Sequence, residues 1–257
     1  MWDPQRYLAR AAERARPFHD LISHVGATAP QTVVDLGCGP GNLTATLAER
    51  WPDAEVIGVD SSASMIDTAR EVAGIQAVRA DLREWEPPSP VDVLVSNAVL
   101  QWVPDHLALL PRLAGWLAPG GWLGFQVPGN YGEPAHVLLR ELADSPAWRD
   151  KIGADQVTRA GSCEPVEYLE ALIALGLRAD VWETTYLHVL EGEDAVLDWM
   201  TGTALRPVLA ALDPDQAVGF VAEYGAKLRA AYPRRPYGTV LPFRRVFAVA
   251  SKQPSER

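Results

Sequence analysis

Cysteine is scarce in this sequence, which has only Cys38 and Cys163 among 257 residues. Two cysteines cannot build the disulfide framework of a small secreted domain or a four-cysteine metal cage. Long apolar runs are also missing, and because a membrane-spanning helix needs about eighteen or more such residues in succession, we expect no membrane span. The first residues mix acids and arginines, so we expect no signal peptide and a cytoplasmic location.

A surplus of positive charge is missing as well. Lysine and arginine number 23 against 33 acids, which gives a formal net charge of −10. We therefore expect no nucleic-acid partner, since binding to phosphates requires a broad basic surface. The five histidines show no metal-ligand spacing, so we expect no metal. A small anionic substrate remains possible if arginines gather locally, and nothing in the sequence indicates an obligate protein partner.

What the sequence has is an alternation of short β-type runs with helical stretches. The β-type runs cover residues 32–36, 54–59, 75–80, 91–97 and 121–128, and the helical stretches cover 45–50, 65–73 and 106–117. The runs are apolar on both faces, which is typical of parallel strands covered by helices on each side. This pattern predicts an α/β fold.

The second half of the chain changes character after Pro128. It reads as a mostly helical insertion, a helix over 165–176, a strand over 177–190, a second helical insertion over 193–231 and a strand over 243–251. Such a terminal pair of strands fits an antiparallel edge on a mostly parallel seven-stranded sheet. We expect one domain over 1–257, with its core in 31–127, 178–190 and 239–252, and a lid built from 1–25, 128–165 and 193–237.

A glycine-rich loop follows the first strand in the stretch VVDLGCGPGNLTATLAER. Its glycines are spaced G-x-G-x-G, whereas the nicotinamide fingerprint is G-x-G-x-x-G, and Asn42 stands where the third dinucleotide glycine belongs. Asp35 precedes the first glycine by two residues, where a negative charge opposes a pyrophosphate but suits a cationic amino-acid tail. The loop therefore favours S-adenosylmethionine over a dinucleotide.

Polar residues at the ends of the next strands support that ligand, because open α/β sheets bind ligands at the carboxyl ends of their strands. Asp60 ends the second strand and can accept both ribose hydroxyls, Asp81 with Leu82 can meet the adenine, and Asn97 ends the fourth strand beside the methionine portion. The candidate cofactor-binding residues are Asp35, Gly37, Gly39, Asp60, Ser61, Met65, Asp81, Leu82, Asn97 and Trp102.

This order of motifs resembles the class I S-adenosylmethionine-dependent methyltransferases, which implies a Rossmann-like fold and S-adenosylhomocysteine as product. Within that superfamily, the stretches SNAVLQWVPDH, FQVPGNYGEPAH, WMTGTALRPVLAAL and RRVFAVASK resemble the trans-aconitate 2-methyltransferase family. The segments around Trp102, His136 and Arg206 are the specific ones. The resemblance implies methyl esterification of trans-aconitate, a tricarboxylate, in the cytoplasm.

A carboxylate acceptor is already ionised at neutral pH, so the reaction needs alignment and no general base. Arginines suit this task because each can bind a carboxylate with two parallel hydrogen bonds. We expect Arg206 and His136 to position the substrate. The other substrate-binding candidates are Arg16, Tyr232 and Tyr7, with Arg14, Arg234, Arg235, Arg244 and Arg245 as further options.

Three alternatives remain open from the residues alone. A methyltransferase acting on a phenol, quinone or amine keeps the cofactor but wants a base or a metal in its pocket. A non-catalytic S-adenosylmethionine-binding protein is the second alternative, although its glycine loop would be expected to have eroded. An NAD-dependent dehydrogenase ranks last because of the glycine spacing.

Overall fold

The computed structural model describes residues 11–157 and 161–254, and these form two compact units. The first, which we call the sheet unit, contains the described residues up to Val127, Cys163–Thr184 and those from Arg245 onward. The second, the insert unit, contains Pro128–Ser162 and Thr185–Arg244. The chain passes from one unit to the other four times, three times within a strand and once between Ser162 and Cys163. Tyr7 lies outside the described residues.

The sheet has seven strands in the order β3-β2-β1-β4-β5-β7-β6. Their bounds are β1 Thr32–Leu36, β2 Glu55–Asp60, β3 Gln76–Arg79, β4 Val91–Asn97, β5 Leu117–Pro128, β6 Arg178–Leu190 and β7 Thr239–Ser251. Strands β1 to β5 pair in parallel with their neighbours. Since the order reverses at β1, the carboxyl ends of β1 and β4 flank the switch point at which such sheets bind ligands.

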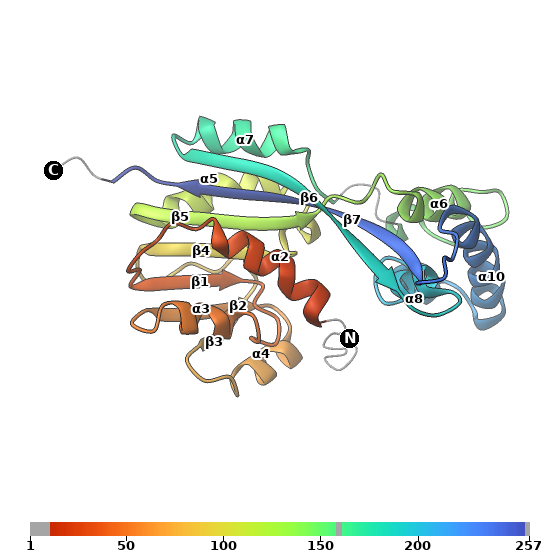
Figure 1. The fold of residues 1–257 in the computed structure, drawn as a ribbon, viewed down its shortest axis with the longest axis horizontal. Coiled ribbons are helices and arrows are strands. Elements are labelled where there is room, and N and C mark those ends of the chain that lie inside the picture. The colour runs from red at the N-terminus through yellow and green to blue at the C-terminus, as the bar shows by residue number, and fades with distance from the viewer. Residues whose placement is uncertain (1–10, 158–160, 255–257) are drawn as a thin grey trace. The chain divides into compact units, whose positions relative to one another are not determined.

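The predicted antiparallel edge is confirmed. The Lys252 main-chain N–H donates to Gly121 O, and the Gly129 N–H donates to Arg244 O, so β7 ends where β5 begins. Strand β7 therefore runs against β5, with β6 pairing on its outer side (Figure 1). The α/β fold of class I methyltransferase type, with a mostly parallel seven-stranded sheet, is as the sequence predicts.

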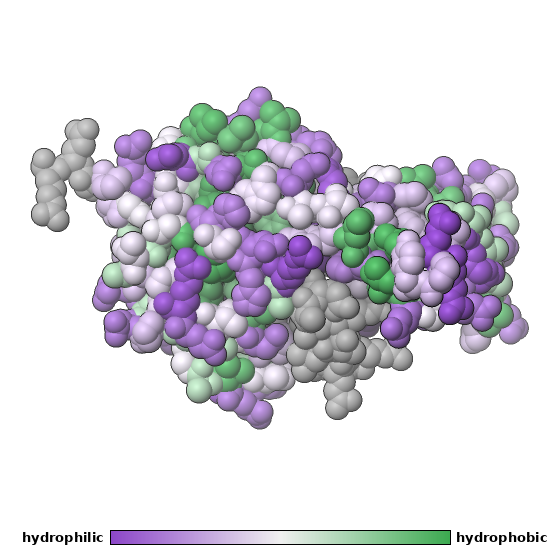
Figure 2. All heavy atoms as spheres, viewed as in Figure 1, coloured by the Kyte–Doolittle hydropathy of each residue, from purple (hydrophilic) through white to green (hydrophobic). Residues whose placement is uncertain are grey.

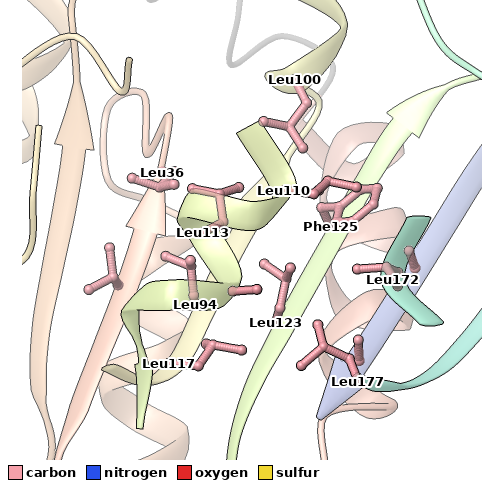
Figure 3. Packing of buried hydrophobic residues seen from close by; sticks show 14 of the residues in the cluster. Leu36, Leu94, Leu100, Leu110, Leu113, Leu117, Leu123, Phe125, Leu172 and Leu177 are labelled. Atoms are coloured by element: carbon pink, nitrogen blue, oxygen red, sulfur yellow. The ribbon is translucent and has the colours of Figure 1, made fainter. Parts of the chain in front are cut away.

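Helices cover both faces of this sheet. Leu94, Leu123 and Phe125 pack on one face against α5 (Leu110–Trp116) and α7 (Pro165–Ala174), as Figure 3 shows. The opposite face meets α2 (Ala11–Ser23), because a Cβ added at Gly124 would contact Leu21 and Val25 at 3.6 and 3.5 Å. Two further helices, α3 (Thr44–Arg50) and α4 (Ala63–Ala69), follow β1 and β2. Short 3-10 turns at η1 (Leu100–Trp102) and η2 (His106–Leu109) follow β4.

Several predicted boundaries differ from the structure; for example, the last strand is predicted over 243–251 but begins at Thr239. The fifth strand was expected to start at Gly121, after a Pro-Gly-Gly turn, but β5 begins at Leu117 and carries that turn as a bulge between Leu117 and Trp122. Glycine fits there because a Cβ on Gly121 would lie 2.8 Å from Val91 O. The predicted helix over 65–73 is shorter and earlier, since α4 ends at Ala69.

The insert unit is helical and has its own core. It contains α6 (Pro134–Ala143), η3 (Ala154–Gln156), α8 (Ala195–Thr201), α9 (Arg206–Ala211) and α10 (Pro214–Ala231). Trp148, Phe220 and Tyr224 are buried in it, and the Tyr224 hydroxyl donates to Ala135 O at 2.8 Å. Among the described residues, no helix is long and apolar enough to cross a membrane.

The visible surface of the sheet unit is mostly polar, with an apolar patch over α7 in Figure 2. Val166 and Ile173 on that helix are more than half exposed, whereas Tyr168 and Leu172 of the same helix are fully buried. Helix α7 therefore anchors on the sheet by one side and presents apolar side chains to solvent on the other.

Candidate active site

The glycine loop after β1 is tied to the neighbouring strand by its main chain. The N–H groups of Gly37 and Cys38 both donate to Val59 O in β2, at 2.7 and 3.1 Å. Gly37, Gly39 and Gly41 have φ angles of +80°, +55° and +81°, a region that glycine adopts without steric cost. The sequence therefore places glycine where the backbone turns back on itself between β1 and α3.

The three glycines differ in what surrounds them. A Cβ on Gly37 would overlap the Val99 side chain, and one on Gly41 would lie 2.7 Å from Ile75 Cδ1. A Cβ on Gly39 would meet no atom of the described residues within 4 Å. Gly37 and Gly41 thus serve internal packing, whereas Gly39 borders open space at the carboxyl end of β1. This is where a ligand could approach the backbone.

Asp60 closes β2 and holds this loop in place. One carboxylate oxygen accepts the Gly39 N–H at 3.0 Å, and the other accepts the Ser62 N–H at 2.8 Å. Each carboxylate oxygen has a second lone pair, so Asp60, which is partly exposed, can still accept hydroxyl donors from a ligand. The structure brings Asp60 and Gly39 together as the sequence predicts.

Asp35 lies at the other side of the loop and is 3% exposed. Burial raises the pKa of its carboxyl group to about 6, against a hydrogen bond from Thr44 that lowers it, and the Asp60 charge raises it further. The Thr44 hydroxyl, at the start of α3, donates to Asp35 Oδ2 at 2.6 Å. A buried carboxylate without a cationic partner is costly, and a ligand ammonium would relieve that cost.

The remaining candidates near β2 divide between surface and core. Ser61 is exposed beside Asp60, whereas Met65 is 4% exposed on the buried side of α4. Burial also raises the pKa of the Cys38 thiol, with Asp35 and Asp60 adding to that rise. Because the thiolate is the reactive form of cysteine, Cys38 serves packing rather than chemistry.

Asp81 follows β3 but is engaged by a neighbour. Its carboxylate accepts the Arg83 main-chain N–H at 2.9 Å and faces the Arg83 guanidinium, with Nη2 2.5 Å from Oδ2. These hydrogen bonds lower the pKa of Asp81 to about 2. Leu82 is half-buried against the sheet core. An adenine amino group would therefore share the Asp81 carboxylate with Arg83.

The end of β4 combines an unpaired polar atom with an unusual backbone. Asn97 Oδ1 is buried and has no hydrogen-bond partner among the described residues, and Ala98 adopts φ +57°. Left-handed backbone on a residue other than glycine costs energy and is concentrated at functional sites. Trp102 follows in η1 and is 61% exposed. Its exposed ring is available to contact a ligand that is bound to the sheet unit.

The substrate candidates are distributed over both units. His136 is buried in α6 of the insert unit beside the Tyr131 ring, and burial lowers its pKa to about 4. The Tyr232 hydroxyl accepts the neighbouring Ala135 N–H at 3.0 Å. Arg206 begins α9 with an exposed side chain. Arg16, in the sheet unit, lies 4.0 Å from Asp20 with 72% of its side chain exposed.

The sequence-based prediction omits Gln126 and includes Arg245 only as a further option for the substrate. Gln126 in β5 is 0% exposed, and Arg245 in β7 is 6% exposed. The signal for Gln126 was present, since it is a polar residue inside the apolar run GWLGFQVP. Within the described part of the chain, no three His, Cys, Asp or Glu side chains are grouped to hold a metal ion.

The geometry of loop, acids and strand order is that of a class I methyltransferase, and the comparisons agree. A methyltransferase-domain family matches residues 33–121. A phosphoethanolamine N-methyltransferase from Haemonchus contortus, solved with S-adenosylhomocysteine, shares the fold at a TM-score of 0.54 and 18% identity, over 93% of this chain and 53% of that one.

The sequence relatives narrow this class. Trans-aconitate 2-methyltransferase of Streptomyces avermitilis is 53% identical, over 98% of this chain and 97% of the relative. That of Rhodococcus jostii is 50% identical, over 98% and 100%. The chain belongs to the trans-aconitate 2-methyltransferase family, as the resemblance indicated, and it is a methyltransferase.

Proposed function

We propose that this chain transfers the methyl group of S-adenosylmethionine to a carboxylate of trans-aconitate or a similar small polycarboxylate. The single observation that carries the site is the open space beside Gly39, bordered by the carboxylate of Asp60. Family membership at 53% identity over nearly the full chain supports the acceptor. The acidic net charge of −10 supports a small molecule rather than a nucleic acid as partner. A cytoplasmic location is part of the same proposal.

The residues of the sheet unit fit the cofactor. Gly39 leaves room for it, Asp60 offers oxygens to ribose hydroxyls, and the buried Asn97 Oδ1 offers an acceptor that no described residue uses. Asp35 offers a negative charge to the amino-acid end. When bound, S-adenosylmethionine supplies an electrophilic methyl group on a sulfonium that leaves as a neutral thioether.

The acceptor oxygen forms the new C–O bond with its own electron pair while the C–S bond breaks, so no proton moves. The chain's work is therefore to orient the acceptor, exclude water and balance the charge of the carboxylates. Arg206 is the proposed anchor in the insert unit. His136 is neutral at pH 7 because its pKa is lowered, and it can donate one hydrogen bond without titrating.

The test is a methyl-transfer assay with a panel of di- and tricarboxylates, followed by release of S-adenosylhomocysteine. We expect methyl-ester formation with trans-aconitate and none with its trimethyl ester, which has no free carboxylate. The rate should be constant between about pH 7 and 9, since the acceptor is already ionised. A rate that rises tenfold per pH unit over this window would indicate a phenol or amine acceptor instead.

A further inference from the structure

A row of polar side chains crosses the sheet unit at the carboxyl ends of β4 and β5. Asn97 and Gln126 are register partners in this parallel pair, so their side chains project from the same face. That face is the one covered by α2, because Gly124, two residues before Gln126, faces Leu21 and Val25. The face is apolar at Gly124 and becomes polar where the strands end.

Arg245 extends this row on β7, the next strand. Its Nη1 lies 2.5 Å from Gln126 Oε1, and both side chains are more than nine-tenths buried. This hydrogen bond fixes the orientation of the Gln126 amide, because only the carbonyl oxygen can accept from a guanidinium. The Gln126 Nε2 donor is then left buried without a hydrogen-bond partner in the described part of the chain.

An unpartnered buried donor costs about 1–3 kcal/mol and needs an explanation in a native fold. A ligand oxygen that accepts a hydrogen bond from this donor is such an explanation. An amide N–H beside the positive charge of a guanidinium favours an anionic oxygen as its acceptor, such as that of a carboxylate. We propose that Gln126 and Arg245 form a subsite that holds one carboxylate of the acceptor.

Strand order assigns this carboxylate to the acceptor rather than to the amino-acid end of the cofactor. The cofactor candidates lie at the ends of β3, β2, β1 and β4, whereas Gln126 and Arg245 lie on β5 and β7, beyond β4 in the sheet. The inference rests on the proposed function, since it names a part of the site that holds the same acceptor.

Two substitutions of Gln126 separate binding from structure. Gln126→Glu keeps the size of the side chain and strengthens its bond with Arg245, but it removes the amide donor and adds a negative charge. Gln126→Leu removes the acceptor that Arg245 uses. If the subsite binds a carboxylate, Glu is the more harmful change, whereas a purely structural role makes Leu the more harmful one.

We expect Gln126→Glu to raise KM for trans-aconitate by about 10- to 100-fold, Gln126→Leu to raise it less, and both to bind S-adenosylhomocysteine within about twofold of the original protein. Gln76→Glu, an exposed change of the same charge in β3, is the control and should leave KM unaltered. Unaltered KM in Gln126→Glu, greater harm from Leu, or a loss confined to S-adenosylhomocysteine affinity would each overturn the subsite.

Titration of trans-aconitate into protein saturated with S-adenosylhomocysteine gives a second readout that needs no turnover. Should Gln126→Glu fail to fold, Arg245→Lys is measured in the same way, and we expect weaker binding because the planar fork is lost. The unaltered protein separates the two hypotheses: if it forms no methyl ester, the proposed function fails, and loss of titrated carboxylate binding in the variants still decides the subsite.

Discussion

At the scale of single residues, we expect the buried Asp35 to make cofactor binding depend on pH. Its pKa is raised to about 6, so the folded protein without ligand holds the proton more tightly than the unfolded chain does. The stability associated with this group is complete below its ordinary pKa and is lost as the pH rises through about 6. A bound ammonium group would favour the ionised carboxylate of Asp35 and so lower its pKa.

We therefore expect the affinity for S-adenosylhomocysteine to rise between about pH 5 and 7 and to level off above pH 7. In Asp35→Asn the affinity should be lower and nearly independent of pH over this range, because no carboxyl group titrates. Calorimetric titration at several pH values measures both curves. A pH dependence retained in Asp35→Asn would assign it to another group.

In the insert unit, Arg206 is the residue proposed to position the substrate. Arg206→Lys keeps the charge but loses the planar fork, so we expect kcat/KM for trans-aconitate to fall by about 10- to 100-fold. Affinity for S-adenosylhomocysteine should barely change. Arg149→Lys is the matched control, since Arg149 is an exposed arginine in the same unit. Equal kinetics for the two variants would remove Arg206 from the site.

At the scale of elements, the glycine loop contains two positions with opposite requirements. Gly37→Ala should destabilise the fold, because its Cβ would overlap Val99 in a left-handed backbone. Gly39→Val adds backbone strain, but its Cβ meets no atom of residues 11–157 and 161–254, so we expect the fold to persist and S-adenosylhomocysteine binding to be lost. Thermal denaturation and calorimetric titration separate the two effects. Gly39→Val with normal cofactor affinity would show that the open space is not used.

The sequence predicts this loop well because its chemistry is local. The spacing of the glycines and the positions of Asp35 and Asp60 in their strands can be read from the order of strands and loops. The structure brings these residues together. The pairing of Asp81 with Arg83 could not be foreseen, since residue types alone do not show whether a partly exposed acid is already bound by a neighbour. Gln126 and Arg245 meet only because β7 lies beside β5, a contact between distant segments.

At the scale of the whole molecule, each unit has a core of its own, and the insert unit depends on a pair of tyrosines. Tyr224 and Tyr232 bind the carbonyl and the N–H of Ala135, which fixes the start of α6. Whether Tyr232 contacts substrate or only holds α6 can be measured. That these two compact units act as one domain with a lid remains a prediction.

We expect Tyr232→Phe to cost about 1–3 kcal/mol of local stability, since the Ala135 N–H loses its acceptor inside the unit. Amide hydrogen exchange should accelerate in α6 and α10 and remain unchanged in β1 and β4. Affinity for S-adenosylhomocysteine should stay the same. Unchanged exchange in α6, together with a raised KM, would indicate that the hydroxyl serves the substrate instead.

The position of β7 has a consequence for biosynthesis. It is the last strand in chain order, yet it lies between β5 and β6 in the sheet. On the ribosome, β6 emerges before the only neighbour that the sheet gives it, and its exposed Leu187 and Val189 then have no paired backbone beside them. Completion of the sheet, and with it the arrival of Arg245, must await translation of the final strand. A nascent chain stalled before residue 239 should therefore be more sensitive to protease in β6 than in β1.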